Sequence, residues 1–258
     1  MDSKIEYKKQ LIELYMKSSK HSNYQTLPES LKVLIPNSEI KTSSKWEYER
    51  WKYICQHLSF DNKKILDIGG NTGFFTFESM TNGALFVDYY EGNNEHAEFV
   101  RLASQLLQLE QQINVFPEYY LFKEGNKIYD IALCLNVIHH LGDDFQSENN
   151  IKEAKEKMII CINNLSTITD ILVFQMGFNW CGNRDQCLFP NGTKIEMKEF
   201  IEKGIEDFWE IIHTGVAVCS QNEIEYVDMN TENHVRMNQL GEFLNRPLFI
   251  MKSKHKPN

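Results

Sequence analysis

The sequence has no long apolar segment. Nowhere does it contain the about 18 consecutive apolar residues that a membrane-spanning helix needs. The N-terminus alternates charged and aromatic residues and lacks the apolar run of a signal peptide. We therefore expect a cytoplasmic protein with no membrane span.

An excess of basic residues is also missing. The chain has 27 Lys and Arg against 36 Asp and Glu, a formal net charge of -9. Proteins that bind nucleic acid normally present a basic face to the phosphates. The net charge therefore argues against a nucleic-acid partner. Only a local basic patch would allow the chain to bind nucleic acid.

Closely paired cysteines are absent as well. The six cysteines are scattered, which fits buried free thiols in a reducing compartment. Only Cys181 and Cys187 share a loop, and no second pair accompanies them as in most zinc sites. We therefore expect no metal.

The composition is that of an ordinary globular protein, with 42% hydrophobic and 24% charged residues among 258. This length suits one α/β domain with an accessory segment. Residues 1–60 carry two capping boxes, Ser3 with Glu6 and Ser44 with Glu47, each followed by apolar residues at helical spacing. We expect residues 1–60 to form an N-terminal helical cap.

From residue 63 onward, short apolar runs alternate with helical stretches, a pattern typical of a parallel sheet with crossover helices. The last two strands have no clear helix between them, so we expect them to pair antiparallel, with a long excursion over 219–245. The predicted strands are 63–68, 84–90, 113–117, 129–135, 168–175, 209–218 and 247–252. The predicted helices are 73–80, 94–108, 148–164 and 194–206.

The first of these strands ends in Asp67 and runs into Gly69, Gly70 and Gly73. Glycines leave room for a ligand, and the N-terminus of the following helix offers backbone N–H groups. Such a turn suits a nucleotide-type cofactor, the alternative being a tight structural turn. Its spacing matches neither the dinucleotide fingerprint nor the phosphate loop, which disfavours NAD and ATP.

Two further strand ends carry polar side chains. Glu91 follows the second strand, where an acid can accept both hydroxyls of a ribose, and Asp88 competes for this role. The fourth strand runs into Asn136, His139 and His140. Either imidazole could serve as a general base or could only cap the strand end by hydrogen bonding. We favour His140 as the base.

Residues 65–73, with the sequence ILDIGGNTG, resemble motif I of the class I S-adenosylmethionine-dependent methyltransferases, with Asn71 at one customary glycine. Residues 129–141 resemble the post-strand motif of the same superfamily, and with residues 246–251 the resemblance covers 63–252. It implies a methyltransferase that uses S-adenosyl-L-methionine. It also implies an α/β, Rossmann-like domain over 61–258, with a seven-stranded, mostly parallel sheet and an antiparallel last strand.

The resemblance assigns a set of cofactor-binding residues. Residues 45–51 resemble an N-terminal helix that closes over the donor in bacterial methyltransferases acting on surface polysaccharides and on tRNA. Arg50 could then bind the methionine carboxylate, or it could form a surface ion pair with Glu47 or Glu49. The predicted cofactor-binding residues are Asp67, Gly69, Gly70, Gly73, Glu91, Asn136 and Arg50.

The loop after the fifth strand is rich in hydrogen-bonding groups. Gln175, Asn179 and Arg184 could bind hydroxyls or an anion, and Trp180 could stack on a sugar or base or serve only as a packing anchor. The loop and the N-terminal helix resemble methyltransferases of capsule or O-antigen assembly.

This resemblance implies O-methylation of a sugar hydroxyl or phosphate-type oxygen on a cell-surface glycan precursor, such as a nucleotide-linked sugar. The alternatives are a tRNA or small-molecule N-methyltransferase and a noncatalytic S-adenosylmethionine-binding protein.

Overall fold

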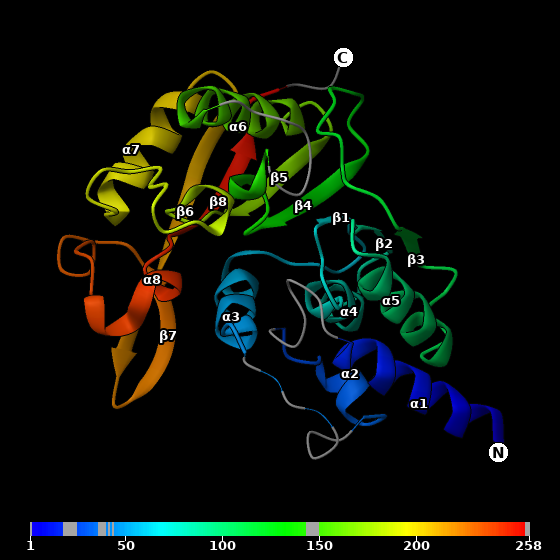
Figure 1. Cartoon of the computed structure of the whole chain (residues 1–258). Helices are drawn as coiled ribbons and strands as arrows, with labels where there is room; N and C mark the ends of the chain where they lie inside the picture. The colour runs from blue at the N-terminus through cyan, green and yellow to red at the C-terminus, as the bar shows by residue number, and fades with distance from the viewer. Residues whose placement is uncertain are drawn as a thin grey trace. The chain divides into compact units, whose positions relative to one another are not determined.

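The computed structural model describes residues 2–17, 25–35, 40, 42, 44–142 and 150–255, and Figure 1 shows its helices and strands. The chain forms two compact units. Unit 1 comprises Met1–Trp51 and Leu58–Tyr120, and unit 2 comprises Lys52–His57 and Leu121–Asn258. The predicted boundary of a separate cap at residue 60 stays a prediction.

Unit 1 is built on three parallel strands in the order β3-β2-β1. Four of the five residues of β1 are buried, as expected for a strand that is covered on both faces. The register places Asp67 beside Tyr89 and Tyr90 beside Phe116. The elements are β1 (Lys64–Ile68), α4 (Phe74–Thr81), β2 (Phe86–Tyr90), α5 (Asn94–Leu106) and β3 (Ile113–Phe116).

Three helices precede these strands: α1 (Asp2–Met16), α2 (Glu29–Lys32) and α3 (Glu47–His57). Helix α1 packs against α5, where the Tyr15 and Phe99 rings lie 5.9 Å apart. The start of α3 differs from a reciprocal capping box, because the Ser44 hydroxyl donates to the Glu47 carboxylate and accepts from the Trp46 N–H. The other predicted box includes Ser3, whose side chain lies outside the described residues.

Unit 2 contains five strands in the order β4-β5-β8-β6-β7. Strands β4 and β5 are parallel, and β8 runs antiparallel to both β5 and β6, which confirms the predicted reversal of the last strand. Helices α6 and α7 lie side by side (Figure 1). The elements are β4 (Tyr129–Leu135), α6 (Ile151–Leu165), β5 (Thr169–Gln175), α7 (Lys194–Ile205), β6 (Trp209–Ser220), β7 (Glu223–Asp228), α8 (Gly241–Leu244) and β8 (Leu248–Ser253).

Strand β7 lies within 219–245, where the sequence predicts a long excursion and no strand. Gln221 and Asn222 adopt left-handed φ values of 52° and 67°, so the chain reverses tightly and β7 pairs antiparallel with β6. The sequence analysis missed this hairpin because its turn lacks the glycine that usually marks such turns. The described part of the chain therefore has one strand more than the seven predicted.

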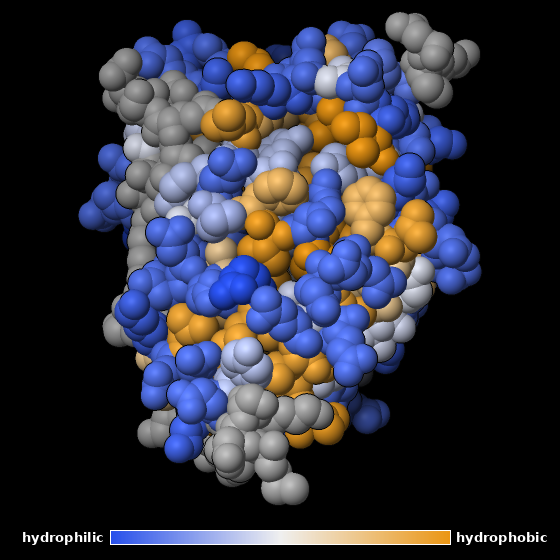
Figure 2. Space-filling model, turned by 90° about the vertical axis from the view of Figure 1, so that its right-hand side faces the viewer, coloured by the Kyte–Doolittle hydropathy of each residue, from blue (hydrophilic) through white to orange (hydrophobic). Residues whose placement is uncertain are grey.

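None of the described helices is long and apolar enough to cross a membrane. The face drawn in Figure 2 presents hydrophilic side chains around patches of hydrophobic ones.

Candidate functional site

The turn after β1 is the first part of the candidate site. Gly69, Asn71 and Gly73 have φ values of 66°, 53° and 79°, so three left-handed residues occur within five positions. Asn71 occupies the place where the motif usually has glycine, and asparagine enters this region more readily than most other residues. The turn therefore keeps the backbone conformation that the motif requires.

Hydrogen bonds hold Asn71 in this conformation. Its side-chain Oδ1 accepts from the Thr72 N–H at 2.9 Å, and its carbonyl accepts from the Tyr89 hydroxyl. Its backbone N–H donates to Glu91 Oε2 at 2.9 Å. The asparagine is thus tied to β2 and to the acid that follows β2.

Gly70 and Asp67 lie under this turn. A Cβ on Gly70 would lie 2.5 Å from Cε2 of Tyr89, so this close approach requires glycine. Asp67 is buried and accepts from the Thr76 hydroxyl at 2.6 Å, which joins β1 to α4. Burial raises the pKa of Asp67 to about 7, and the nearby Glu91 charge adds to the effect.

Glu91 is half-buried directly after β2, and its two carboxylate oxygens accept from two different backbone segments. Besides the bond from Asn71, its Oε1 accepts from the Asn93 N–H at 2.8 Å. The competing residue, Asp88, lies within β2 and accepts from Nδ2 of Asn114 on β3 at 2.7 Å. The geometry of unit 1 therefore favours Glu91 as the acid associated with the glycine turn.

Gln25 is a residue of this region that the sequence analysis missed. Its buried side-chain oxygen accepts from the Thr72 hydroxyl at 3.1 Å and from the Phe74 N–H at 3.0 Å. It therefore caps the N-terminus of α4, where free N–H groups otherwise lack intrahelical partners. No local signal could reveal it, because Gln25 precedes Phe74 by 49 positions.

Aromatic rings surround the end of β2 near Glu91. Tyr90 stacks on Phe116 with 4.5 Å between ring centroids and meets the Tyr120 ring edge-on at 4.9 Å. A Cβ on Gly92 would overlap the Tyr119 ring, so Tyr119 covers the glycine that follows Glu91. Tyr119 and Tyr120 were not predicted here because they lie outside every predicted element.

Arg50 lies on the first part of α3, within unit 1. Its guanidinium is 3.7 Å from Glu47 and 5.1 Å from the ring centroid of Phe75, in the first turn of α4. Both charged side chains are buried, so this ion pair differs from the surface pair considered as an alternative. A role of Arg50 in binding a carboxylate stays a prediction.

The end of β4 in unit 2 is organised around Asn136, which has a left-handed φ of 64°. Its Nδ2 donates to Gln175 Oε1 at 2.9 Å, and its Oδ1 accepts from Nη1 of Arg246 at 2.7 Å. Arg246 also pairs with Glu242 at 2.6 Å. Gln175 is fully buried, and its hydrogen bond fixes the position of Asn136. Arg246 is a residue of this site that was not predicted from the sequence.

The two histidines that follow differ in exposure. His139 is buried against Gly177, where a Cβ would lie 2.7 Å from the imidazole. His140 is half-buried, and Gly182 lies beside its ring. This difference in exposure favours His140 for exchange of a proton with a substrate.

The loop after β5 packs on the segment that carries these histidines. Trp180 is buried, and its Nε1 donates to the Leu141 carbonyl at 2.5 Å, so in this structure the ring anchors the loop. Asn179 forms an isolated bridge with Cys187, and Arg184 is exposed. Trp180 and Gly182 of this loop therefore lie against the segment that carries the histidines, and the acceptor-binding roles stay predictions.

No family model matches the chain. It is 22% identical over 169 residues to a tRNA U34 carboxymethyltransferase from Helicobacter hepaticus, which covers 62% of this chain and 49% of that protein. It is 24% identical over 152 residues to a tRNA U34 carboxymethyltransferase from Ruthia magnifica, covering 53% and 46%. The chain thus spans about half the length of these relatives.

A solved structure of the bifunctional kinase-methyltransferase WbdD matches 94% of this chain and 46% of WbdD, with a TM-score of 0.58 at 13% identity. The chain has a class I methyltransferase fold. The predicted α/β fold class is thereby confirmed. At 13% identity the likeness concerns the fold alone.

Proposed function

We propose that this chain is a methyltransferase that uses S-adenosylmethionine as the methyl donor. The observation that carries the proposal is the left-handed turn of residues 69–73, tied by the Asn71 N–H to the Glu91 carboxylate. When bound, the donor supplies a methyl group on a sulfonium, which is already activated for in-line displacement.

The residues of unit 1 fit the parts of this donor. The backbone N–H groups of the turn suit its polar methionine end, and the Glu91 carboxylate suits the ribose hydroxyls. A carboxylate oxygen can accept more than one hydrogen bond. Tyr119 and Tyr90 offer flat aromatic faces for the adenine.

In unit 2, His140 is the candidate for removing a proton from an acceptor hydroxyl or amine. A positioned general base contributes roughly 10²- to 10⁴-fold to such a reaction. Asn136, held by Gln175 and Arg246, fixes the strand end from which the histidines follow.

We favour tRNA as the acceptor. The two curated relatives are both named as tRNA U34 carboxymethyltransferases, and they match more than half of this chain. The names of these relatives outweigh the preference against nucleic acid that was drawn from composition. A net charge of -9 describes the whole surface and not the part that a tRNA would contact.

A sugar hydroxyl or phosphate-type oxygen of a glycan precursor is the second candidate acceptor. The pairing of basic side chains with acids favours it: Lys152 lies 4.0 Å from Glu156 on α6, and Lys198 pairs with Glu202 on α7. Such pairs weaken the long-range field that would attract a polyanion. Arg184 remains as an exposed cation for a small anionic acceptor.

Donor binding is tested by calorimetric titration with S-adenosylmethionine. Glu91→Ala should weaken binding about 10- to 100-fold, since a hydrogen bond to a charged group contributes roughly 1.5–3 kcal/mol. Glu91→Gln keeps one carbonyl oxygen and should lose less. Glu98→Ala removes an exposed carboxylate from α5 and is the matched control.

The acceptor is tested with donor labelled on the methyl group, incubated in parallel with unmodified tRNA and with glycan precursors. Transfer to tRNA that disappears in His140→Ala would support the favoured acceptor. Transfer only to glycans would replace it with the second candidate. Donor binding without transfer to any acceptor would favour a noncatalytic binding protein.

A further inference from the structure

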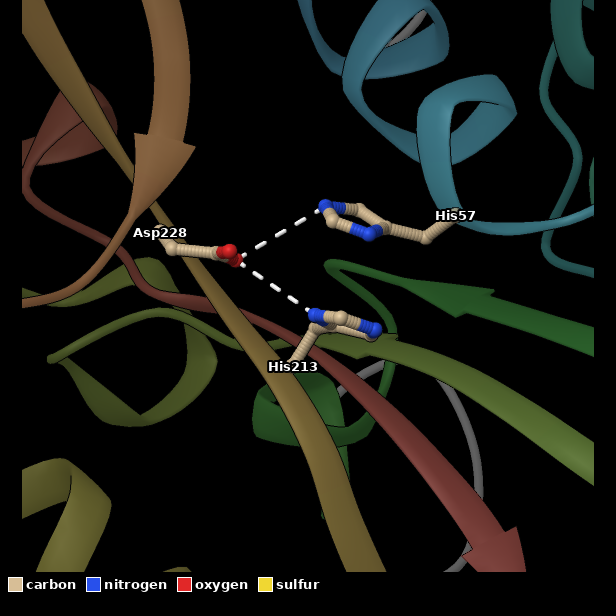
Figure 3. A group of neighbouring side chains, drawn as sticks. All are labelled: His57, His213 and Asp228. Atoms are coloured by element: carbon tan, nitrogen blue, oxygen red, sulfur yellow. Dashed lines mark ion pairs between the residues drawn. The ribbon is translucent and has the colours of Figure 1, made fainter.

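Two histidines and an aspartate from three elements of unit 2 lie together (Figure 3). His57 is the last residue of α3, His213 lies on β6, and Asp228 ends β7. One potential ligand atom from each side chain lies within 4.8 Å of the other two. The imidazole rings stack with centroids 3.7 Å apart, and a nitrogen of each points toward the carboxylate.

The spacing of these atoms fits the ligands of one metal ion. His57 Nε2 and His213 Nδ1 lie 3.7 Å and 3.6 Å from the same oxygen of Asp228. Good N–H···O hydrogen bonds are about 2.7–3.2 Å long. Two ligands at ~2.0–2.2 Å from a tetrahedral zinc ion are instead ~3.3–3.5 Å apart.

We propose that His57, His213 and Asp228 form a binding site for a divalent zinc-like cation. Imidazole nitrogen and carboxylate oxygen are both ordinary zinc ligands, and imidazole also suits copper and nickel. Three protein ligands leave a fourth position for water or an anion. The site lies on side chains that the proposed methyl transfer does not use.

Local features of the fold build this arrangement. The register of β6 against β8 shifts between Ile211 and His213, and a bulge of this kind re-aims a side chain. Gly215 of β6 pairs with Asp228, and a Cβ on it would lie 2.5 Å from the Tyr53 ring. Glycine at this position therefore lets Tyr53 lie directly on the strand.

Tyr53 holds the aspartate through a hydrogen bond. Its hydroxyl donates to Asp228 Oδ1 at 2.5 Å, and it precedes His57 by one helical turn on α3. Hydrogen bonds of this kind orient metal ligands, and their loss typically costs about 10- to 100-fold in metal affinity. The side chain of Asp228 is 59% exposed, so a cation can reach the carboxylate from solvent.

Titration of the chelator-treated full chain with Zn²⁺, in the absence of methyl donor, tests the site. We expect one equivalent to bind, and Co²⁺ in its place to give the visible absorption of a tetrahedral complex. His57→Ala and His213→Ala should each weaken Zn²⁺ binding by about 10-fold or more, and Tyr53→Phe by about 10-fold. His234→Ala removes a histidine outside the cluster and should change nothing.

Two results would overturn the proposal. One is the lack of saturable Zn²⁺ binding by the wild-type chain. The other is wild-type affinity in the combined His57→Ala and His213→Ala variant, which would assign the ion to other residues. Circular dichroism melts without metal check folding, and Asp228→Asn or His213→Gln serves where an alanine variant does not fold. Because no donor is present, failure here leaves the methyltransferase proposal untouched.

Discussion

Replacement of Asp67 by asparagine should change how the stability of the protein depends on pH. Asp67 is buried beneath the turn of residues 69–73, and burial raises its pKa from 3.8 to about 7. The unfolded chain exposes the carboxyl to water and restores its ordinary pKa. The asparagine amide would keep an oxygen to accept the Thr76 hydroxyl, and it carries no titratable proton.

The sign of the effect follows from proton binding. Between about pH 4 and about pH 7 the native protein holds a proton on Asp67 that the unfolded chain has lost, so the free energy of unfolding falls as the pH rises. Below about pH 4 both states are protonated and Asp67 brings no penalty. Above about pH 7 the penalty is complete, and the difference between 3.8 and about 7 corresponds to about 4 kcal/mol.

Urea unfolding of wild type and Asp67→Asn, followed by circular dichroism at about pH 4.5, 6, 7 and 8, measures this difference across the window between the two pKa values. The variant should gain stability relative to wild type with rising pH, by up to ~4 kcal/mol at the highest pH. Asp61→Asn, which removes an exposed carboxylate from the turn before β1, is the control. A stability difference that stays constant across the pH series would refute the reasoning.

Three further substitutions test the packing of the site. Gly70→Ala places a methyl group 2.5 Å from Tyr89 and should lower the free energy of unfolding, measured in urea, by about 1–3 kcal/mol. The same substitution should cost less in a chain that also carries Tyr89→Ala, because the ring that it meets is gone. Gln25→Ala removes the cap of α4 and should cost ~1 kcal/mol, measured as a lower midpoint in thermal melts. Trp180→Phe removes the indole N–H that donates to the Leu141 carbonyl and should cost about 1–3 kcal/mol in urea unfolding, with wild-type stability contradicting the anchoring role.

The turn and the acid of the proposed donor site could be recognised from the sequence because their signals are local. A strand, a turn with left-handed residues and a helix follow one another within Lys64–Thr81. The apolar run of the strand and the glycines of the turn can both be read from the sequence. Glu91 was identifiable because it directly follows the next strand. The helices and strands of the crossover region were predicted for the same reason, since apolar periodicity reports burial of one face.

The features of unit 2 depend on contacts between distant positions. Arg246 reaches Asn136 across 110 positions, and the cluster of His57, His213 and Asp228 has no internal spacing that a motif could describe. The β6–β7 hairpin was missed because Gln221 adopts a left-handed conformation, which glutamine rarely does. Such features become visible only when the strand order is known.

Asn71 shows what a motif position requires. The position needs a left-handed backbone, which glycine adopts without strain and asparagine with little. The bond from the backbone N–H at this position to Glu91 would form with glycine as well, whereas the bond from the Thr72 N–H needs the Asn71 side chain. The departure from the usual glycine thus adds a side-chain hydrogen bond within the turn, while the backbone of the same residue joins the turn to the acid of the proposed donor site.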